Sequence, residues 1–177
     1  MTYNVCMISG EPRYDSLPVL MVDRYRNTPV NDRMAAEAQF CLNETEWIAR
    51  LWAFETAPAP ESRMEALFAG EDGRAAVRMY LTAGGAFGCE AAGRDVKEAL
   101  SVYAFTGGDL QGEYWGGVLR LPRELFLDAV GIKTPEKGTI LMGNVVKRIP
   151  SVGAAFWEAP CDADAPEAFG AFELIDY

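Results

Sequence analysis

The chain has 177 residues, 26 acidic against 16 basic side chains, a formal net charge of −10, and no histidine. This charge repels nucleic-acid phosphates and acidic membrane headgroups, so neither is an expected partner, whereas neutral ligands such as sugars are not penalised. The lack of histidine excludes Ser-His-Asp and Cys-His catalysis and imidazole zinc sites, which leaves acid–base chemistry to carboxylates, Lys, Tyr or Cys.

Length and cysteine spacing indicate the number of domains and the state of the thiols. A chain of this size usually builds one core, so we expect residues 1–177 to form a single domain. Cys6, Cys41, Cys89 and Cys161 lie far apart without a C-x-x-C pair. This spacing favours buried free thiols in a reducing compartment, with a disulfide pair as the alternative. The first residues lack the features of a signal peptide, and no stretch is apolar enough to span a membrane, so we expect a cytoplasmic protein.

The first half of the chain has strand-like patterns. Residues 18–25 form a short apolar run typical of an edge strand. Residues 34–42 alternate apolar and polar side chains, and Trp47–Glu55 is aromatic-rich with period two. The polar residues 43–46 between them predict a turn, so the two segments should form an antiparallel hairpin. Residues 57–73 hold prolines and glycines and predict a loop.

A helical turn around Arg63–Phe68 is expected within that loop. Beyond it, Arg74–Thr82 reads as a strand. The glycine-rich but apolar segment Gly84–Gly93 predicts a strand that a neighbouring backbone approaches closely. Leu100–Thr106 predicts another strand, followed by a turn at residues 107–109.

The last third contains the clearest helix signal. The segment PRELFLDAV has Pro122 in its first turn, Glu124 early, and Gly131 just past its end. It follows an expected strand at Glu113–Arg120. Three more strands are expected, at Thr139–Arg148, Val152–Trp157 and Ala168–Ile175. Roughly nine or ten short strands with one helix predict an all-β fold, an antiparallel β-sandwich or jelly roll with one short helix.

The C-terminal third resembles the ending of family 9-type carbohydrate-binding modules, which have a DOMON-like β-sandwich. That ending combines a strand of the form G-x-x-W-x-x-N-F-Y-R, a Trp-containing W-S/N-P strand, and F-H-x-P-E-x-F-G-x-L-x-F. The similar segments here are GTILMGNVVKR (Gly138–Arg148), AFWEAP (Ala155–Pro160) and PEAFGAFEL (Pro166–Leu174). Earlier segments similar to family motifs are Ile48–Glu55, Arg74–Leu81 and Glu113–Leu125.

The chain also departs from the family pattern. The His before Pro166 is absent, the family's Asp and Glu in the Arg74 strand are Gly73 and Arg78, and its aromatic pair is Val145–Val146. In the characterised xylanase-linked members two Trp side chains clamp the sugar, with structural calcium nearby. The resemblance therefore implies a β-sandwich that holds a sugar without transforming it, whereas the departures concern the sugar site more than the fold.

Sugar rings present a C–H face that packs on aromatic planes, and their hydroxyls need a polar rim. We rank Trp157 first as such a platform and Trp115, beside Tyr114, second; burial in the core is the alternative for each tryptophan. Asn144 sits inside an apolar run and must find partners in the backbone or a ligand. The expected ligand-binding residues are Trp157, Trp115, Tyr114, Asn144, Arg50, Glu55 and Glu158.

Two other functions remain open. A saccharide-processing enzyme, or its accessory subunit, would need two carboxylates, and Glu55, Glu113 and Glu158 are the first to test. An assembly module without a ligand would bury its aromatics in the core or in a homodimer interface. No catalytic residue and no cofactor is expected, although oxygen ligands around Glu71–Asp72 or Asp162–Asp164 leave calcium possible. The sequence specifies neither the sugar nor the oligomeric state.

Overall fold

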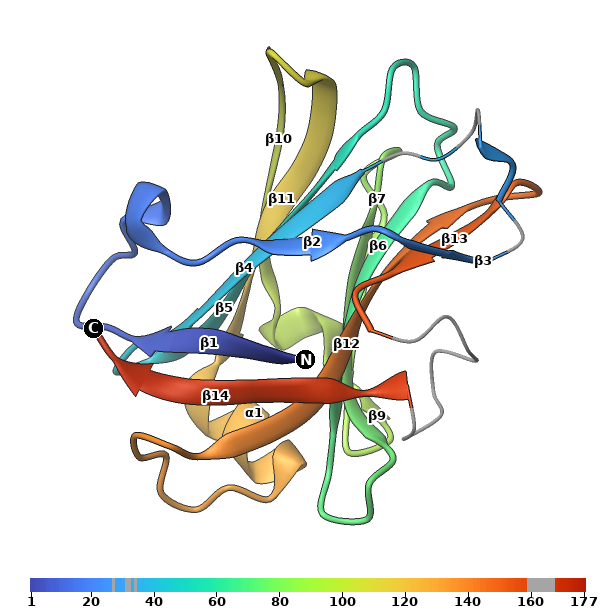
Figure 1. Cartoon of the computed structure of the whole chain (residues 1–177). Coiled ribbons are helices and arrows are strands. Elements are labelled where there is room, and N and C mark those ends of the chain that lie inside the picture. The colour runs from blue at the N-terminus through green and yellow to red at the C-terminus, as the bar shows by residue number, and fades with distance from the viewer. Residues whose placement is uncertain (27, 31–32, 34, 159–167) are drawn as a thin grey trace.

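The structure, a computed structural model, describes residues 1–26, 28–30, 33, 35–158 and 168–177. Its strands form one curled sheet in the order β10-β11-β5-β4-β1-β14-β12-β6-β7-β8-β9, with β2, β3 and β13 attached to its side (Figure 1). The elements are β1 (Thr2–Met7), β2 (Leu20–Val22), β3 (Arg24–Arg26), β4 (Ala36–Leu42), β5 (Glu46–Phe54), β6 (Arg63–Ala69), β7 (Ala75–Thr82), β8 (Phe87–Ala91), β9 (Arg94–Asp95), β10 (Ser101–Asp109), β11 (Gly112–Pro122), α1 (Arg123–Val130), β12 (Ile140–Ile149), β13 (Gly153–Phe156) and β14 (Gly170–Asp176).

The curl brings the two halves of the sheet face to face across one aromatic core. Phe40 on β4 and Trp47 on β5 come from one half, and Phe68 on β6 comes from the other. The Phe68 ring lies 5.6 Å from that of Phe40 and 5.0 Å from that of Trp47, both edge to face. The helix α1 covers one end of this core, where Phe126 stacks on Trp47 at 4.1 Å. Burial of these large rings is a dominant stabilising term. The fold is therefore the predicted mostly-β sandwich with one short helix.

Two local predictions are confirmed in detail. The hairpin of β4 and β5 pairs Ala36 with Ala53 through Leu42 with Trp47. Its turn is closed by Asn43, whose Oδ1 accepts the backbone N–H groups of Thr45 and Glu46. The helix begins directly after Pro122 and ends at Gly131, whose φ of 78° is a left-handed conformation that glycine adopts without strain.

The structure differs from the predicted elements in the first half of the chain. The prediction of a loop with a helical turn at residues 63–68 is wrong: this segment is strand β6, which pairs with β7 and β12 and turns Met64, Ala66 and Phe68 into the core. Strand β1 was not predicted, and it pairs in parallel with both β14 and β4. Figure 1 shows β1 and β14, the two ends of the chain, side by side. The turn expected at residues 107–109 lies later, because β10 runs to Asp109.

The thiols follow the prediction where the structure describes them. Cys6, Cys41 and Cys89 are free and buried, and Cys161 lies outside the described residues. The predicted strand within Gly84–Gly93 is β8, and the close backbone approach lies in the turn before it, where a Cβ on Gly84 would be 2.9 Å from the Pro60 carbonyl oxygen. In the described ranges, no helix is long and apolar enough to cross a membrane.

Candidate ligand-binding site

The outer face of β10, β11, β5 and β4 forms the floor of the candidate site. Residues aligned across neighbouring strands share a face of the sheet. One such row runs Tyr103, Val118, Arg50 and Gln39. The adjacent row runs Phe105, Gly116, Trp52 and Glu37. The alternate residues of β5, such as Ala49 and Leu51, belong to the core, so the same strand carries the core on one side and the site on the other.

A pocket of about 400 Å³ opens on this face. Tyr103, on the edge strand β10, is 72 % exposed, so its ring is available to a ligand. Tyr114 packs edge to face against Phe105 at 6.2 Å and against Phe54 at 5.8 Å. The pocket is lined by Tyr14, Arg50, Tyr103, Phe105, Thr106, Tyr114, Val118 and Arg120.

Arg50 lies at the centre of the aromatic side chains. Its guanidinium carbon is 4.9 Å from the ring centres of both Tyr14 and Trp52, and 5.4 Å from that of Phe105. One of its nitrogens donates to Gln39 Oε1 at 3.2 Å. Cation–π contacts of this kind stabilise a positive charge that is partly withdrawn from water. The guanidinium is therefore held in one place before any ligand arrives.

Gln39 connects Arg50 to residues 10–17, the segment that carries Tyr14 and forms one wall of the pocket. Gln39 is 3 % exposed, and its Nε2 donates to the carbonyl oxygens of Tyr14 and Leu17 at 2.8 and 3.0 Å. Leu17 packs in turn with Ile48 and Val118 in a small hydrophobic cluster on this outer face. Both ends of the Gln39 amide are thus used, one to hold the wall and the other to hold Arg50.

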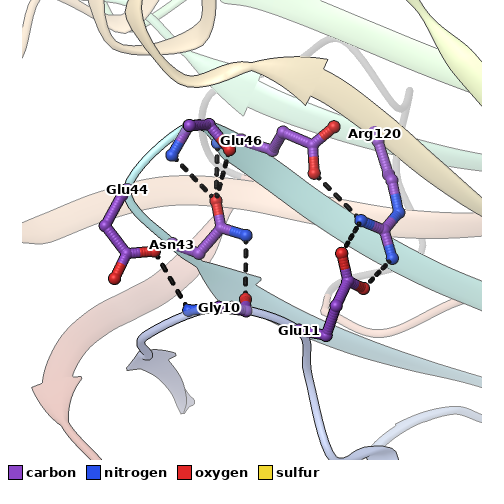
Figure 2. A network of polar contacts seen from close by, with 7 residues as sticks. Gly10, Glu11, Asn43, Glu44, Glu46 and Arg120 are labelled. Carbon is purple, nitrogen blue, oxygen red and sulfur yellow. Dashed lines mark hydrogen bonds and ion pairs between the residues drawn. The ribbon is translucent and has the colours of Figure 1, made fainter.

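A second polar network fixes the start of the same wall, as Figure 2 shows. Arg120 on β11 donates to both oxygens of Glu11, at 3.0 and 2.6 Å, and to Glu46 Oε2 at 3.0 Å. The hydrogen bond from Arg120 lowers the pKa of the Glu11 carboxyl. Asn43 Nδ2 donates to the Gly10 carbonyl oxygen, and the Gly10 N–H donates to Glu44 Oε2, each at 3.0 Å. These contacts bind residues 10 and 11 to the β4–β5 turn and to β11.

Two further groups on this face are partly desolvated. The Tyr14 hydroxyl is buried and finds no hydrogen-bond partner of acceptable geometry among the described residues. Burial raises the pKa of Tyr14, and the nearby Arg120 charge opposes this to a smaller degree. Glu37 is 9 % exposed, and burial raises its pKa while a hydrogen bond from Trp52 opposes the rise.

Gly116 lets β11 lie close to Trp52 at the floor. A Cβ at this position would be 2.2 Å from the Leu51 carbonyl oxygen and 2.7 Å from Trp52 Cβ. No other residue fits there without displacing the strands.

The residues expected from the sequence to bind ligand lie in three separate places. Arg50 and Tyr114 line the outer-face pocket. Trp115 is 4 % exposed and points to the core, where its Nε1 donates to Glu55 Oε2 at 2.9 Å. This Glu55 is buried against Lys147, with Nζ 3.0 Å from Oε2. Arg50 and Glu55 thus face opposite sides of the sheet, as strict alternation along β5 requires.

The third place lies beside the start of the chain. Trp157 is 4 % exposed and packs on Phe172 at 4.8 Å between ring centres. Glu158 pairs with the amino group of Met1 at 3.3 Å and with Arg24 at 3.6 Å. Asn144 is fully buried; it donates to the Ala168 carbonyl oxygen and accepts the N–H groups of Val145 and Glu158. The expectation that Asn144 must find partners is confirmed, and these partners are backbone groups.

Sequence reasoning missed Tyr14, Tyr103 and Phe105. The segment LSVYAFT alternates, which places Tyr103 and Phe105 on one face, so a signal existed for that pair. Tyr14 is the first residue of a single 3₁₀ turn, Tyr14–Ser16, and nothing in the local sequence indicates that it closes a pocket.

Of the two possible calcium sites, the one at Glu71–Asp72 lies within the described residues. Asp72 Oδ1 accepts the Arg74 N–H within its own turn. Asp162–Asp164 lie outside the described residues. In the part of the chain that the structure describes, His, Cys, Asp and Glu side chains form no group of three or more that could hold a metal ion.

Compared by sequence, the chain matches no family model and no curated protein. Compared by structure, it is similar to a family 9 carbohydrate-binding module from Caldicellulosiruptor kristjanssonii in complex with cellotriose, with a TM-score of 0.70 and 12 % identity over 100 % of this chain and 95 % of that one. A family 9 module from the same organism in complex with glucose gives 0.70 and 12 %, over 98 % and 96 %. A Bacteroides uniformis protein, provisionally assigned as carbohydrate-binding, gives 0.66 and 14 %, over 98 % of each chain. The chain therefore has the fold of family 9 carbohydrate-binding modules, and the resemblance seen in the sequence is confirmed at the level of fold.

Proposed function

We propose that this chain is a non-catalytic saccharide-binding protein and that the outer-face pocket is its site. The observation that carries the proposal is that the exposed ring of Tyr103 lines the same pocket as the Arg50 guanidinium, which is already held in place by Gln39 and three aromatic rings. An aromatic face stacks on the C–H face of a sugar, and the guanidinium of Arg50 donates to its oxygens. Tyr114, Phe105 and Thr106 complete the surface around them. The shared fold with modules that bind cellotriose and glucose supports this function.

Binding without catalysis is favoured by the side chains around the pocket. Hydrolysis of a glycosidic bond needs two carboxyl groups on either side of that bond. Among the described residues, those lining the pocket include no Asp or Glu. Of the three candidate carboxylates, Glu55 lies in the core and Glu158 lies beside the chain start, whereas Glu113 is exposed on β11 but does not line the pocket.

Tyr103→Ala tests the proposal directly. We expect the variant to lose saccharide affinity by about tenfold or more, as for the central aromatic of a binding site. Because Tyr103 is largely exposed, its free energy of unfolding should change by less than about 0.5 kcal/mol. Calorimetric titration with sugars that bind the parent, together with a denaturant melt, measures both quantities.

Tyr177→Ala is the matched control, since Tyr177 is 63 % exposed and does not line this pocket. It should bind as the parent does. Unchanged affinity in Tyr103→Ala would remove this pocket from the proposal.

Glu11→Gln tests the role of the polar network in Figure 2. Glu11 is outside the pocket lining, and its own side chain is mostly exposed, so the loss in stability should be about 0–1 kcal/mol. Saccharide affinity should fall about two- to fivefold, because the wall that carries Tyr14 loses one of its attachments.

Asp176→Asn provides the control for Glu11→Gln, because it removes an exposed ion pair, Lys137–Asp176, in which neither residue lines the pocket. Calorimetry on both variants at one salt concentration compares them. Equal affinities in the two variants would show that the network does not support the site.

A further inference from the structure

Arg50 differs from the other arginine of the pocket in having no carboxylate partner. Arg120 pairs with Glu11 and Glu46. Within the described residues, Arg50 forms no ion pair, and the hydrogen bond to Gln39 is the only one that its guanidinium donates. A guanidinium carries five N–H donors, so most of the donors of Arg50 are left for a ligand.

The lack of a carboxylate partner is unusual for a guanidinium in the surroundings of Arg50. Three rings lie within 5.4 Å of its guanidinium carbon and displace water from it. A charge that loses water is stabilised most by a charge-assisted hydrogen bond to an anion. The charge of Arg50 also acts on the buried carboxyl of Glu37, but Glu37 forms no ion pair with it, accepts a hydrogen bond from Trp52 and lies outside the pocket lining.

The other polar side chains of the pocket do not supply a strong acceptor. They are the hydroxyls of Thr106, Tyr103, Tyr114 and Tyr14, together with Arg120. No carboxylate or carboxamide oxygen lines it among the described residues. Each hydroxyl of a neutral sugar brings a donor along with its acceptors and carries no charge, whereas a carboxylate brings acceptors only, so a carboxylate matches the free donors of Arg50 better.

We propose that the saccharide bound in this pocket is acidic, with a carboxylate that accepts a bidentate pair of hydrogen bonds from Arg50. The planar fork of arginine matches a carboxylate in shape and charge. The net charge of −10 opposes anions only at long range, since salt screens charges beyond about 8 Å at physiological ionic strength. This inference rests on the proposed function and narrows its ligand to uronic acids and similar sugars.

The experiment compares matched ligands by calorimetry at pH 7. The pairs are glucuronate with glucose and galacturonate with galactose, and the methyl ester of each acid keeps its size but removes its charge. At least one acid should bind about tenfold or more tightly than both its neutral parent and its ester, as expected for a charge-assisted pair. This advantage should fall as salt rises from 20 mM to 1 M, a readout that needs no variant.

Variants of Arg50 locate the contact. In Arg50→Gln the ratio of acid to neutral affinity should fall to about one, and Arg50→Lys, which keeps the charge without the fork, should retain part of it. A thermal melt shows that each variant is folded. An acid preference that survives Arg50→Gln overturns the inference.

The remaining outcomes distinguish failure of the acidic-ligand inference from failure of the proposed saccharide-binding function. Acid and neutral sugars that bind equally, and that both weaken in Tyr103→Ala, overturn the acidic ligand but leave the saccharide site standing. No binding of any of these sugars, or of longer acidic and neutral oligosaccharides, overturns both.

Discussion

Glu55→Ala is expected to lower the free energy of unfolding by about 3–5 kcal/mol, because it leaves the buried ammonium of Lys147 without its counter-ion. The side chains of Lys147 and Glu55 are 1 % and 4 % exposed, and Lys147 Nζ lies 3.0 Å from Glu55 Oε2. Ser62 accepts from Nζ at 2.8 Å and donates to Glu55 Oε1 at 2.7 Å, and Trp115 donates to Oε2. The four side chains satisfy one another, so removing the carboxylate leaves the Ser62 O–H and the Trp115 N–H without an acceptor and the Lys147 ammonium without a counter-ion.

The pH dependence of this loss has a definite sign. Burial lowers the pKa of Lys147, and Glu55 opposes that effect. Between the lowered pKa and the ordinary value of 10.5, the unfolded chain binds more protons than the folded one, so this group makes stability rise with pH. Without Glu55 the pKa of Lys147 falls further. The difference in stability between parent and Glu55→Ala should therefore shrink as the pH is raised from 7 towards 10.

Urea melts at several pH values measure this difference. Glu113→Ala, which removes an exposed glutamate one strand away, should change stability by less than about 0.5 kcal/mol. The double variant Glu55→Leu/Lys147→Met should recover most of the loss, since apolar groups of similar volume can replace a buried pair. A single-variant loss below about 1 kcal/mol would mean that water reaches Lys147 when Glu55 is removed.

Where local signals were strong, the sequence was sufficient to predict the structure. Pro122 and Gly131 mark the ends of α1 because each acts through its own backbone geometry, with no need for tertiary contacts. The β4–β5 hairpin was likewise predictable, since alternation and a polar turn are properties of adjacent residues. The parallel pairing of β1 with β14 joins opposite ends of the chain, and no local pattern encodes it.

Strand β6 was missed because both of its sides are buried. Met64, Ala66 and Phe68 face the main core, whereas Leu67 joins a second cluster with Val146 and Phe156 on the opposite side. Such a strand loses the apolar–polar alternation on which its recognition depends. Glu65 is buried on that second side among three arginines, whereas a charged residue in the sequence alone predicts a solvent-exposed position.

The candidate pocket was only half predictable for a related reason. Arg50 and Tyr114 were chosen as polar or aromatic residues in strands, but the search for a platform favoured tryptophans. All four tryptophans are at most 8 % exposed, because a large apolar ring contributes most when buried. The rings that remain accessible are smaller, such as Tyr103 on an edge strand, and their presence in one pocket with Arg50 depends on strand register and on the distant Tyr14 segment.

Raising the pH from 9 to 11 is expected to lower the free energy of unfolding by about 5 kcal/mol through two buried thiols alone. Burial raises the pKa of Cys41 and of Cys89 from 9.0 to about 12. In the unfolded chain both thiols ionise above pH 9, while in the folded protein both stay protonated. The folded state therefore holds more protons in this window, and stability falls by about 1.4 kcal/mol per pH unit for each thiol. Burial also raises the pKa values of Cys6 and Tyr3, which adds to the loss in the same direction.

Guanidinium melts at pH 8, 9, 10 and 11 under a reducing agent test this expectation. Cys41→Ala and Cys89→Ala should each flatten the slope by about 1.4 kcal/mol per pH unit, and the double variant by twice that amount. Lys147→Met separates the opposing contribution of the buried ammonium, which acts only below pH 10.5. A parent slope that stays flat to pH 11 would mean that the thiols ionise inside the folded protein. That requires water to reach Cys41, which is fully buried beneath the wall of the candidate pocket, so the same measurement reports how firmly that wall is held.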